Sequence, residues 1–267
     1  MKLKNIIYNI ICAVVLLIIY TACDDIGVEE RLIDRTKGEA VRCILVEEYS
    51  GQLCYNCPAG AAVLSELQDK FSSDSVIVVC IHANAPNFAI SEPYGFATEL
   101  SEDLYLSAGR PALPSIRINR QGTPIEFNAE IWRKTIDDAL KIPNGIDMEL
   151  QNIYIEEMDS IYVSVKINPL ISDNAKLLVW LTESGIKAPQ MLENKDISQD
   201  YEHKHIFRTS MTSDVLNGDE VELVRNEEFI ANYMLKLNKS WNPDHLEVVA
   251  FVYNDNGVLG VTTKALK

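Results

Sequence analysis

The segment from Arg42 to Phe71 limits the possible folds more than any other part of the chain. Its residues predict a short apolar strand, a tight loop, the pair Cys54 and Cys57, and then a helix that Pro58 opens. The unpaired N–H groups and the dipole at a helix N-terminus stabilise a thiolate. We therefore expect Cys54 to titrate below an ordinary cysteine, and Cys57, one turn into the helix, can close a disulfide onto it.

Thioredoxins have the same order of strand, cysteine pair and helix, and the segment resembles their active site. The resemblance implies that Cys54 is the nucleophile and that Cys57 resolves the mixed disulfide. It also implies that Glu48, six residues before Cys54, is a buried carboxylate that takes a proton from Cys57. Further along, Leu113-Pro114 resembles the hydrophobic residue and cis-proline with which thioredoxins hold an extended substrate beside the cysteines.

Each of these assignments has an alternative based on the same residues. The cysteine pair can be a structural staple, or half of a zinc site for which no second Cys or His pair is well placed. Glu48 can be a solvated charge at a strand end, and Pro114 can be an ordinary trans-proline before a strand. Cys43 and Cys80 fall in predicted core strands, and we interpret both as inert packing residues.

The four histidines do not form a recognisable metal site. His203 and His205 share one face if their segment is a strand, but a third ligand is not identifiable. We therefore predict no metal and no cofactor. We expect loop or surface positions for all four, which are His82, His203, His205 and His245.

The N-terminus has the pattern of an export signal. Lys2 and Lys4 precede an apolar run of signal-peptide length, Ile6 to Tyr20. The run ends in Tyr-Thr-Ala-Cys, which resembles a bacterial lipobox and implies that Cys23 carries the lipid and begins the mature chain. A plain secretory signal or an uncleaved anchor is the alternative. In either case the compartment lies outside the cytoplasm, where disulfides persist.

Composition and periodicity divide the rest of the chain. A length of 267 residues with 47% hydrophobic residues suits one large or two ordinary domains. After Ile146 the pattern becomes strands only, with a strong hairpin turn at Asp255-Asn256-Gly257, and about seven or eight strands suggest a sandwich of immunoglobulin type. The strand candidates are residues 146–157, 160–170, 175–184, 204–211, 219–226, 229–237, 246–254 and 257–266.

We therefore predict four segments. They are a signal peptide at 1–22, an acidic tether at 23–40, an α/β thioredoxin-like domain at 41–143 and an all-β immunoglobulin-like sandwich at 144–267. The net charge of −15 excludes nucleic acid as a natural partner, because a phosphate backbone requires clusters of Lys and Arg.

Several short motifs in a fixed order give a second resemblance. After the lipobox come the segment around the cysteine pair, Leu113-Pro114, Tyr201-Glu-His-Lys-His205 followed by Arg208, and Trp241-Asn-Pro. This order resembles the outer-membrane-protein-28-related lipoproteins of the Bacteroidetes type. The resemblance implies a lipid-anchored protein of the outer membrane, facing either the cell surface or the periplasm, with the membrane itself as one partner.

Two functions fit these patterns. The first is thiol–disulfide exchange at Cys54 and Cys57, acting on envelope proteins with thiols or disulfides, which would make the chain an oxidoreductase. The second is a surface binding or adhesion lipoprotein, in which the thioredoxin-like domain is a scaffold. A low-pKa, exposed Cys54 favours the first function, and a buried, permanently oxidised pair favours the second.

The lipobox generates the first testable prediction. In Cys23→Ser the acceptor of the thioether lipid is gone, so the protein should no longer label with palmitate and should leave the membrane fraction. Fractionation and metabolic labelling measure both. If the variant still labels and stays with membranes, Cys23 is not the lipidated residue.

Overall fold

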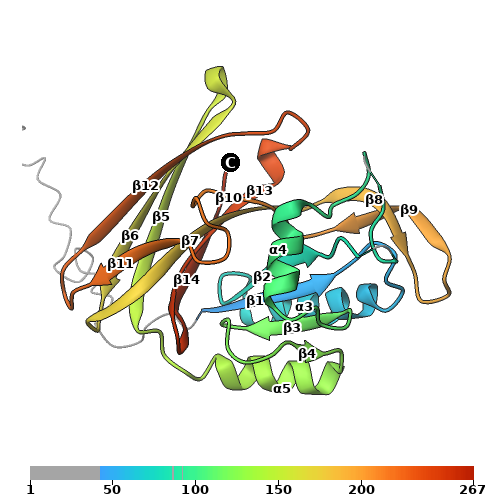
Figure 1. The fold of residues 1–267 in the computed structure, drawn as a ribbon, viewed down its shortest axis with the longest axis horizontal. Helices are drawn as coiled ribbons and strands as arrows, with labels where there is room; N and C mark the ends of the chain where they lie inside the picture. The colour runs from blue at the N-terminus through green and yellow to red at the C-terminus, as the bar shows by residue number, and fades with distance from the viewer. Residues whose placement is uncertain (1–42, 86, 92) are drawn as a thin grey trace, which may run out of the picture. The chain divides into compact units, whose positions relative to one another are not determined.

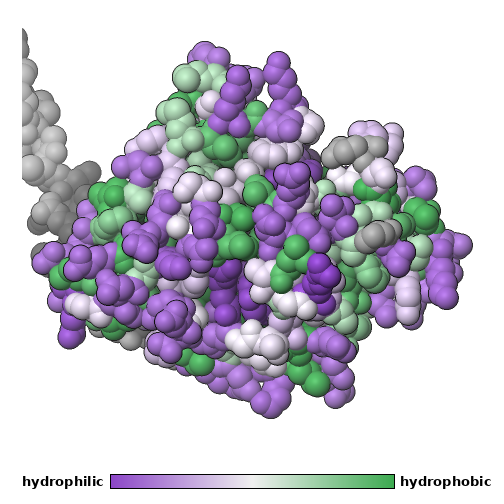
Figure 2. Space-filling view, in the orientation of Figure 1, coloured by the Kyte–Doolittle hydropathy of each residue, from purple (hydrophilic) through white to green (hydrophobic). Residues whose placement is uncertain are grey.

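The computed structural model describes residues 43–85, 87–91 and 93–267 (Figure 1). These residues belong to one compact unit. The predicted signal peptide, Cys23 and the tether lie outside the described residues. Within the described part of the chain, no helix is long and apolar enough to cross a membrane. Figure 2 shows hydrophilic residues spread over one face, with hydrophobic residues in small groups between them.

The first part of the chain alternates strands and helices, and the second part is made of strands. The elements are β1 Ile44–Ser50, α3 Cys57–Phe71, β2 Val76–His82, α4 Glu99–Ser107, β3 Ser115–Ile118, β4 Ile125–Glu126, α5 Ala129–Ala139, β5 Ile146–Ile155, η1 Glu156–Met158, β6 Ser160–Pro169, β7 Asp173–Glu183, β8 Ile186–Met191, β9 Ile197–His203, β10 Ile206–Ser210, β11 Asp219–Leu223, β12 Phe229–Lys236, η2 Pro243–His245, β13 Leu246–Asn254 and β14 Gly257–Ala265.

All eight strand segments predicted after residue 146 contain a strand, and the predicted turn at 255–257 joins β13 to β14. The prediction missed β8 and β9. Their sequences, IKAPQM and ISQDYEH, carry few apolar residues, and β8 includes Pro189. Strand prediction depends on apolar alternation, so a short polar hairpin gives little signal.

The largest sheet of the described residues joins strands from both halves of the chain. Its order is β14-β13-β7-β10-β2-β1-β3-β4, and β11 also pairs with β7, which makes nine strands. β1 and β2 are parallel, and β10 pairs parallel to β2 at Ile206 and Cys80. Three further strands, in the order β12-β6-β5, form a separate sheet. The chain is therefore β-rich with a mixed sheet, and its division near residue 143 remains a prediction.

β1 is buried along its whole length because both of its faces are covered. Ile44 and Val46 pack into a core with α3 and α5. Leu45 and Tyr49 pack on the opposite face with α4 and with aromatic side chains from β7, β10 and β13. A third core lies between β5, β6 and the strands β7, β13 and β14. Double-sided burial explains the apolar run Ile44-Leu45-Val46 at the start of β1.

Glu47 is a charged residue on this buried strand, and two arginines neutralise it. Arg117 on β3 binds its carboxylate with two nitrogens, at 2.7 and 3.0 Å, and Arg120 lies at 3.6 Å. Arg120 also donates to the carbonyl of Leu216 and stacks over the ring of Tyr253. The ion pair therefore links β1 and β3 to the second half of the chain.

This buried pair generates a stability prediction. Arg117→Ala should lower the free energy of unfolding by about 3 kcal/mol. The variant leaves the buried Glu47 carboxylate with Arg120, at 3.6 Å, in place of the closer bidentate pair. Urea denaturation measures the loss. Arg133→Ala is the matched control, since its pair with Glu66 is equally short but exposed, and its loss should be much smaller. Equal losses in the two variants would contradict the account.

Candidate functional site

Cys54 and Cys57 form a disulfide at the start of α3. Cys57 is the first residue of the helix, which confirms the predicted pair at a helix N-terminus, although Cys57 begins the helix and does not lie one turn into it. Cys54 is 3% exposed and Cys57 is 1% exposed. Both cysteine residues are therefore almost completely buried.

The β8–β9 hairpin, orange in Figure 1, packs on the cysteine loop. The amide of Gln190 on β8 donates to the carbonyl oxygens of Cys54, at 3.1 Å, and Gly51, at 3.4 Å. The backbone N–H of Met191 donates to the carbonyl of Gln52 at 2.8 Å. These bonds join residues that are more than 130 positions apart in the sequence.

Gln52 completes the attachment from the side of the cysteine loop. Its amide nitrogen donates to the carbonyls of Pro189, at 3.0 Å, and Tyr94, at 2.9 Å. Its amide oxygen accepts from the N–H of Phe96 at 3.0 Å. The side chain is 1% exposed, so each bond satisfies a buried polar group. Sequence analysis did not single out Gln52 or Gln190, because neither belongs to a motif and their partners are distant.

A cavity of about 320 Å³ borders Cys57. One face of α3, the strands β1 and β2, the β8–β9 hairpin and the turn between β9 and β10 enclose it. Glu48, Cys57, Cys80, Tyr201 and His203 are among the residues that line it. The structure thus brings predicted site residues, Glu48 and Cys57, to the same cavity.

Glu48 is buried and is not a solvated strand-end charge, since it is 3% exposed. It is the register partner of Cys80 across β1 and β2, and the two side chains are hydrogen bonded. Burial raises the pKa of Glu48 to about 7, although the bond from Cys80 acts in the opposite direction. Burial also raises the pKa of the Cys80 thiol. Cys80 is a free, buried cysteine as expected, but it also contacts the candidate proton acceptor.

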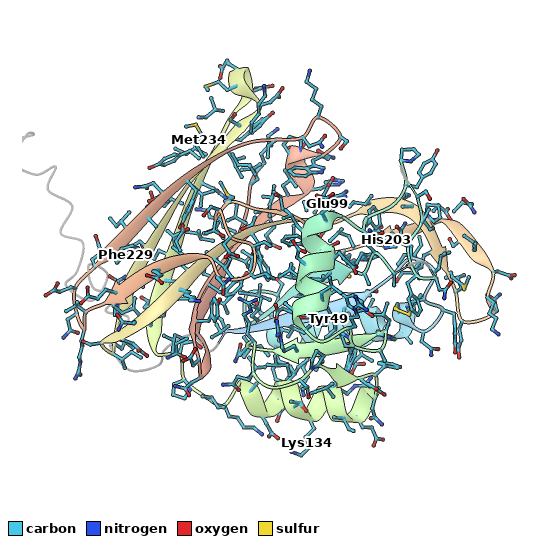
Figure 3. The ribbon with its side chains drawn as sticks, viewed as in Figure 1. Tyr49, Glu99, Lys134, His203, Phe229 and Met234 are labelled. Atoms are coloured by element: carbon cyan, nitrogen blue, oxygen red, sulfur yellow. A yellow bond between two sulfur atoms is a disulfide. The ribbon has the colours of Figure 1, made fainter. Side chains whose placement is uncertain are left out.

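The expectation of loop or surface histidines is wrong for two of the four. His82 and His203 are 3% and 4% exposed, and their rings meet edge to face at 5.8 Å. Figure 3 labels His203 on β9. Its ring also packs against Phe96 and Tyr201, and burial lowers its pKa to about 4. The aromatic ring of a neutral histidine packs like other aromatic rings, which accounts for the burial.

His203 and His205 do not share a strand face, because β9 ends at His203 and His205 lies in a turn with a positive φ of 56°. His205 contacts the amide oxygen of Gln68 at 3.1 Å. His245, in η2, is exposed. No group of three or more His, Cys, Asp or Glu among the described residues is arranged to hold a metal ion.

The Leu113–Pro114 peptide bond is cis, as expected. Pro114 packs next to Gly60 of α3, where an added Cβ would lie 3.2 Å from the proline ring. Leu113 similarly lies 3.4 Å from the position of a Cβ on Gly51. Both predicted residues therefore border the cysteine loop. The carbonyl of Pro114 is occupied, since it accepts from the N–H of Phe127.

The buried carboxyl of Glu48 generates a pH prediction. Its pKa is about 7 in the folded state against an ordinary value of 4.5, so the folded state holds the proton more tightly. Its contribution to stability is therefore complete below pH 4.5 and is lost as the pH rises to about 7. Relative to Glu48→Gln, the wild-type protein should lose about 3 kcal/mol of unfolding free energy over this range.

The glutamine variant is also the control, because the pH effects of all other groups are common to both proteins. Denaturation at several pH values between 4 and 8 measures the difference. Parallel stability profiles would show that Glu48 titrates as an ordinary carboxyl.

Known structures share this fold. HBP35 of Porphyromonas gingivalis superimposes with a TM-score of 0.69 at 17% identity, covering 86% of this chain and 76% of that one. A protein from Agrobacterium tumefaciens, AGR_C_4864, gives a TM-score of 0.55 at 13% identity, covering 86% and 96%. At these identities the likeness shows the fold only. No curated protein matches the sequence.

The sequence also matches a protein family. A domain of the outer membrane lipoprotein Omp28 from Porphyromonas gingivalis is 19% identical over 45% of this chain, but its TM-score of 0.31 is too low to show a shared fold. Residues 101–267 match the model of the family described as Outer membrane protein Omp28. That match spans more than half of the sequence and includes the β8–β9 hairpin. The chain therefore belongs to the Omp28 family, whose description supports a location at the outer membrane.

Proposed function

We propose that this chain is a binding lipoprotein of the cell envelope, in which a thioredoxin-like fold is the scaffold and the Cys54–Cys57 disulfide is structural. The order β1, α3, β2, β3, β4 and α5 supports the thioredoxin-like assignment, as does the packing of Pro114 next to Gly60 of α3. Family membership supports attachment to the outer membrane. The lipid at Cys23, the orientation toward surface or periplasm, and an immunoglobulin-like second half are parts of the same proposal.

The burial of both cysteines is the observation that carries this proposal. Thiol–disulfide exchange requires a thiolate to approach a disulfide sulfur, so its rate depends on access. Cys54 is 3% exposed, and two buried glutamines attach the β8–β9 hairpin to its loop. Moving the hairpin would leave several buried carbonyl and N–H groups without partners, each at a cost of about 1–3 kcal/mol.

Thiol–disulfide exchange is the second candidate, and one observation favours it. Glu48 lines the same cavity as Cys57, and its pKa of about 7 suits a group that accepts and returns a proton near neutral pH. In that case Cys54 is the nucleophile, Cys57 resolves the mixed disulfide, and Leu113 and Pro114 hold the substrate chain. The exchange would require the β8–β9 hairpin to open first.

Protection of the disulfide by the hairpin is testable. Gln190→Ala removes the bonds to Cys54 and Gly51, so a reductant such as dithiothreitol should reduce the disulfide about tenfold faster than in the wild type. Mass spectrometry of alkylated thiols measures the rate. Gln121→Ala is the matched control, because the exposed amide of Gln121 donates to the carbonyl of Asn256, which belongs neither to the hairpin nor to the cysteine loop. Equal rates in all three proteins would show that the hairpin does not protect the disulfide.

A trapping experiment in cells separates the two candidate functions. Cys57→Ser removes the resolving thiol, so an exchange enzyme would accumulate mixed disulfides through Cys54. We expect no mixed disulfides with Cys57→Ser, in agreement with a structural disulfide. The control Cys54→Ser should also trap no mixed disulfides. Mixed disulfides in the first variant only would establish thiol–disulfide exchange instead.

A further inference from the structure

The cavity behind Cys57 is large enough for a small ligand. Its volume of about 320 Å³ is at the lower end of the range for ligand pockets, about 300–1,000 Å³, whereas a water molecule takes about 30 Å³ in the liquid. The exposed side chains of Glu202 and Lys204 line it together with buried residues, so it opens to solvent. Space and an entrance are therefore both present.

Two residues that line this cavity each carry a buried hydrogen-bond acceptor without a donor. Within the described residues, Oε1 of Glu48 and Nε2 of His203 have no hydrogen-bond partner. The His203 ring bonds the backbone carbonyls of Ala188 and Pro189, which leaves Nδ1 as the nitrogen that carries the hydrogen. Burial keeps the ring neutral, so Nε2 presents a lone pair. A ligand that satisfies both atoms must supply N–H or O–H donors.

The charge around Glu48 further narrows the ligand class. The pKa of its carboxyl reflects burial and the bond from Cys80, and no positively charged side chain contributes to it. Lys204 lines the cavity as an exposed side chain but does not contribute to the pKa of Glu48, and Arg208 is paired with Glu183. A positive ligand would thus complete an ion pair that the chain leaves open. Tyr201 lines the same cavity, and an aromatic ring attracts a cation.

We infer that this cavity binds a primary ammonium group on a short alkyl stem, with Glu48 as its counterion and Nε2 of His203 as a second acceptor. The stem would lie against Ala61 and Val78, which form part of the apolar wall. A free alkylamine and a lysine side chain of a peptide present the same chemistry. The inference rests on the binding function proposed above and names the ligand class for it.

Calorimetric titration of the mature protein at pH 8 with n-butylamine tests the inference. The ammonium form should bind with saturation, while n-butanol and butyrate, which lack the positive donor group, should bind at least tenfold more weakly. Nα-acetyl-lysine methylamide tests whether a lysine side chain enters as well as a free amine. Equal binding of n-butanol, or no saturable binding of n-butylamine, overturns the inference. In either case Glu48 and His203 would not select an ammonium group.

Two variants locate the binding in this cavity. Glu48→Gln should weaken n-butylamine at least tenfold, which corresponds to about 1.4 kcal/mol, and Ala61→Leu should abolish binding by filling the cavity without touching Glu48. The second variant keeps the test valid if the first does not fold. Glu220→Gln, an exposed site on β11, is the control and should bind as the wild type does. Unchanged affinity in Glu48→Gln and Ala61→Leu overturns the assignment.

The failure of this inference differs from failure of the proposed function. If the protein does not bind n-butylamine and Cys57→Ser traps no mixed disulfides, the inferred ligand class is wrong and the disulfide is still structural. Mixed disulfides trapped by Cys57→Ser would contradict the proposed function whatever the amine titration shows.

Discussion

The attachment of the β8–β9 hairpin to the cysteine loop determines what this site can do. Gln52 and Gln190 are buried amides that bond only backbone groups, and each bonds at least one group of the opposite segment. Inside a protein such bonds are expensive to leave unmade, so the loop and the hairpin hold each other in place. Both cysteines of the disulfide in this loop are buried. The same hairpin supplies Gln190, Tyr201 and His203 to the cavity that Cys57 also lines.

The mixed sheet reinforces this attachment. β10 follows the hairpin directly and pairs parallel to β2, so the N–H of Cys80 donates to the carbonyl of His205 at 2.8 Å. Glu47, buried between Arg117 and Arg120, adds a charged connection toward Leu216 and Tyr253. Strand pairing, a polar network and an ion pair thus hold the second half of the chain against the first.

Local sequence patterns predicted the local structure well. The strand, cysteine pair and helix of residues 44–71 are in the predicted order, Leu113–Pro114 is cis, and the turn at 255–257 joins two strands. Each of these features depends on neighbours within a few residues. The burial of Glu48 was one of two open alternatives, because a strand alone does not say what covers its faces.

The covering of the site could not be predicted in the same way. Gln190 and Cys54 are 136 positions apart, and no periodicity records such a contact. β8 and β9 are short and polar, so they lack the apolar alternation by which strands are recognised. His203 is buried by the aromatic rings of segments far away in the sequence, including Phe96. The features that decide between exchange and binding are therefore the long-range ones.

The reduction potential of the Cys54–Cys57 pair tests the central claim most directly. It can be measured by equilibrating the mature protein in redox buffers and quantifying alkylated thiols. A structural disulfide protected by the hairpin should have a potential below about −300 mV. A value between about −270 and −120 mV, the range of known thiol–disulfide oxidoreductases, would contradict the account.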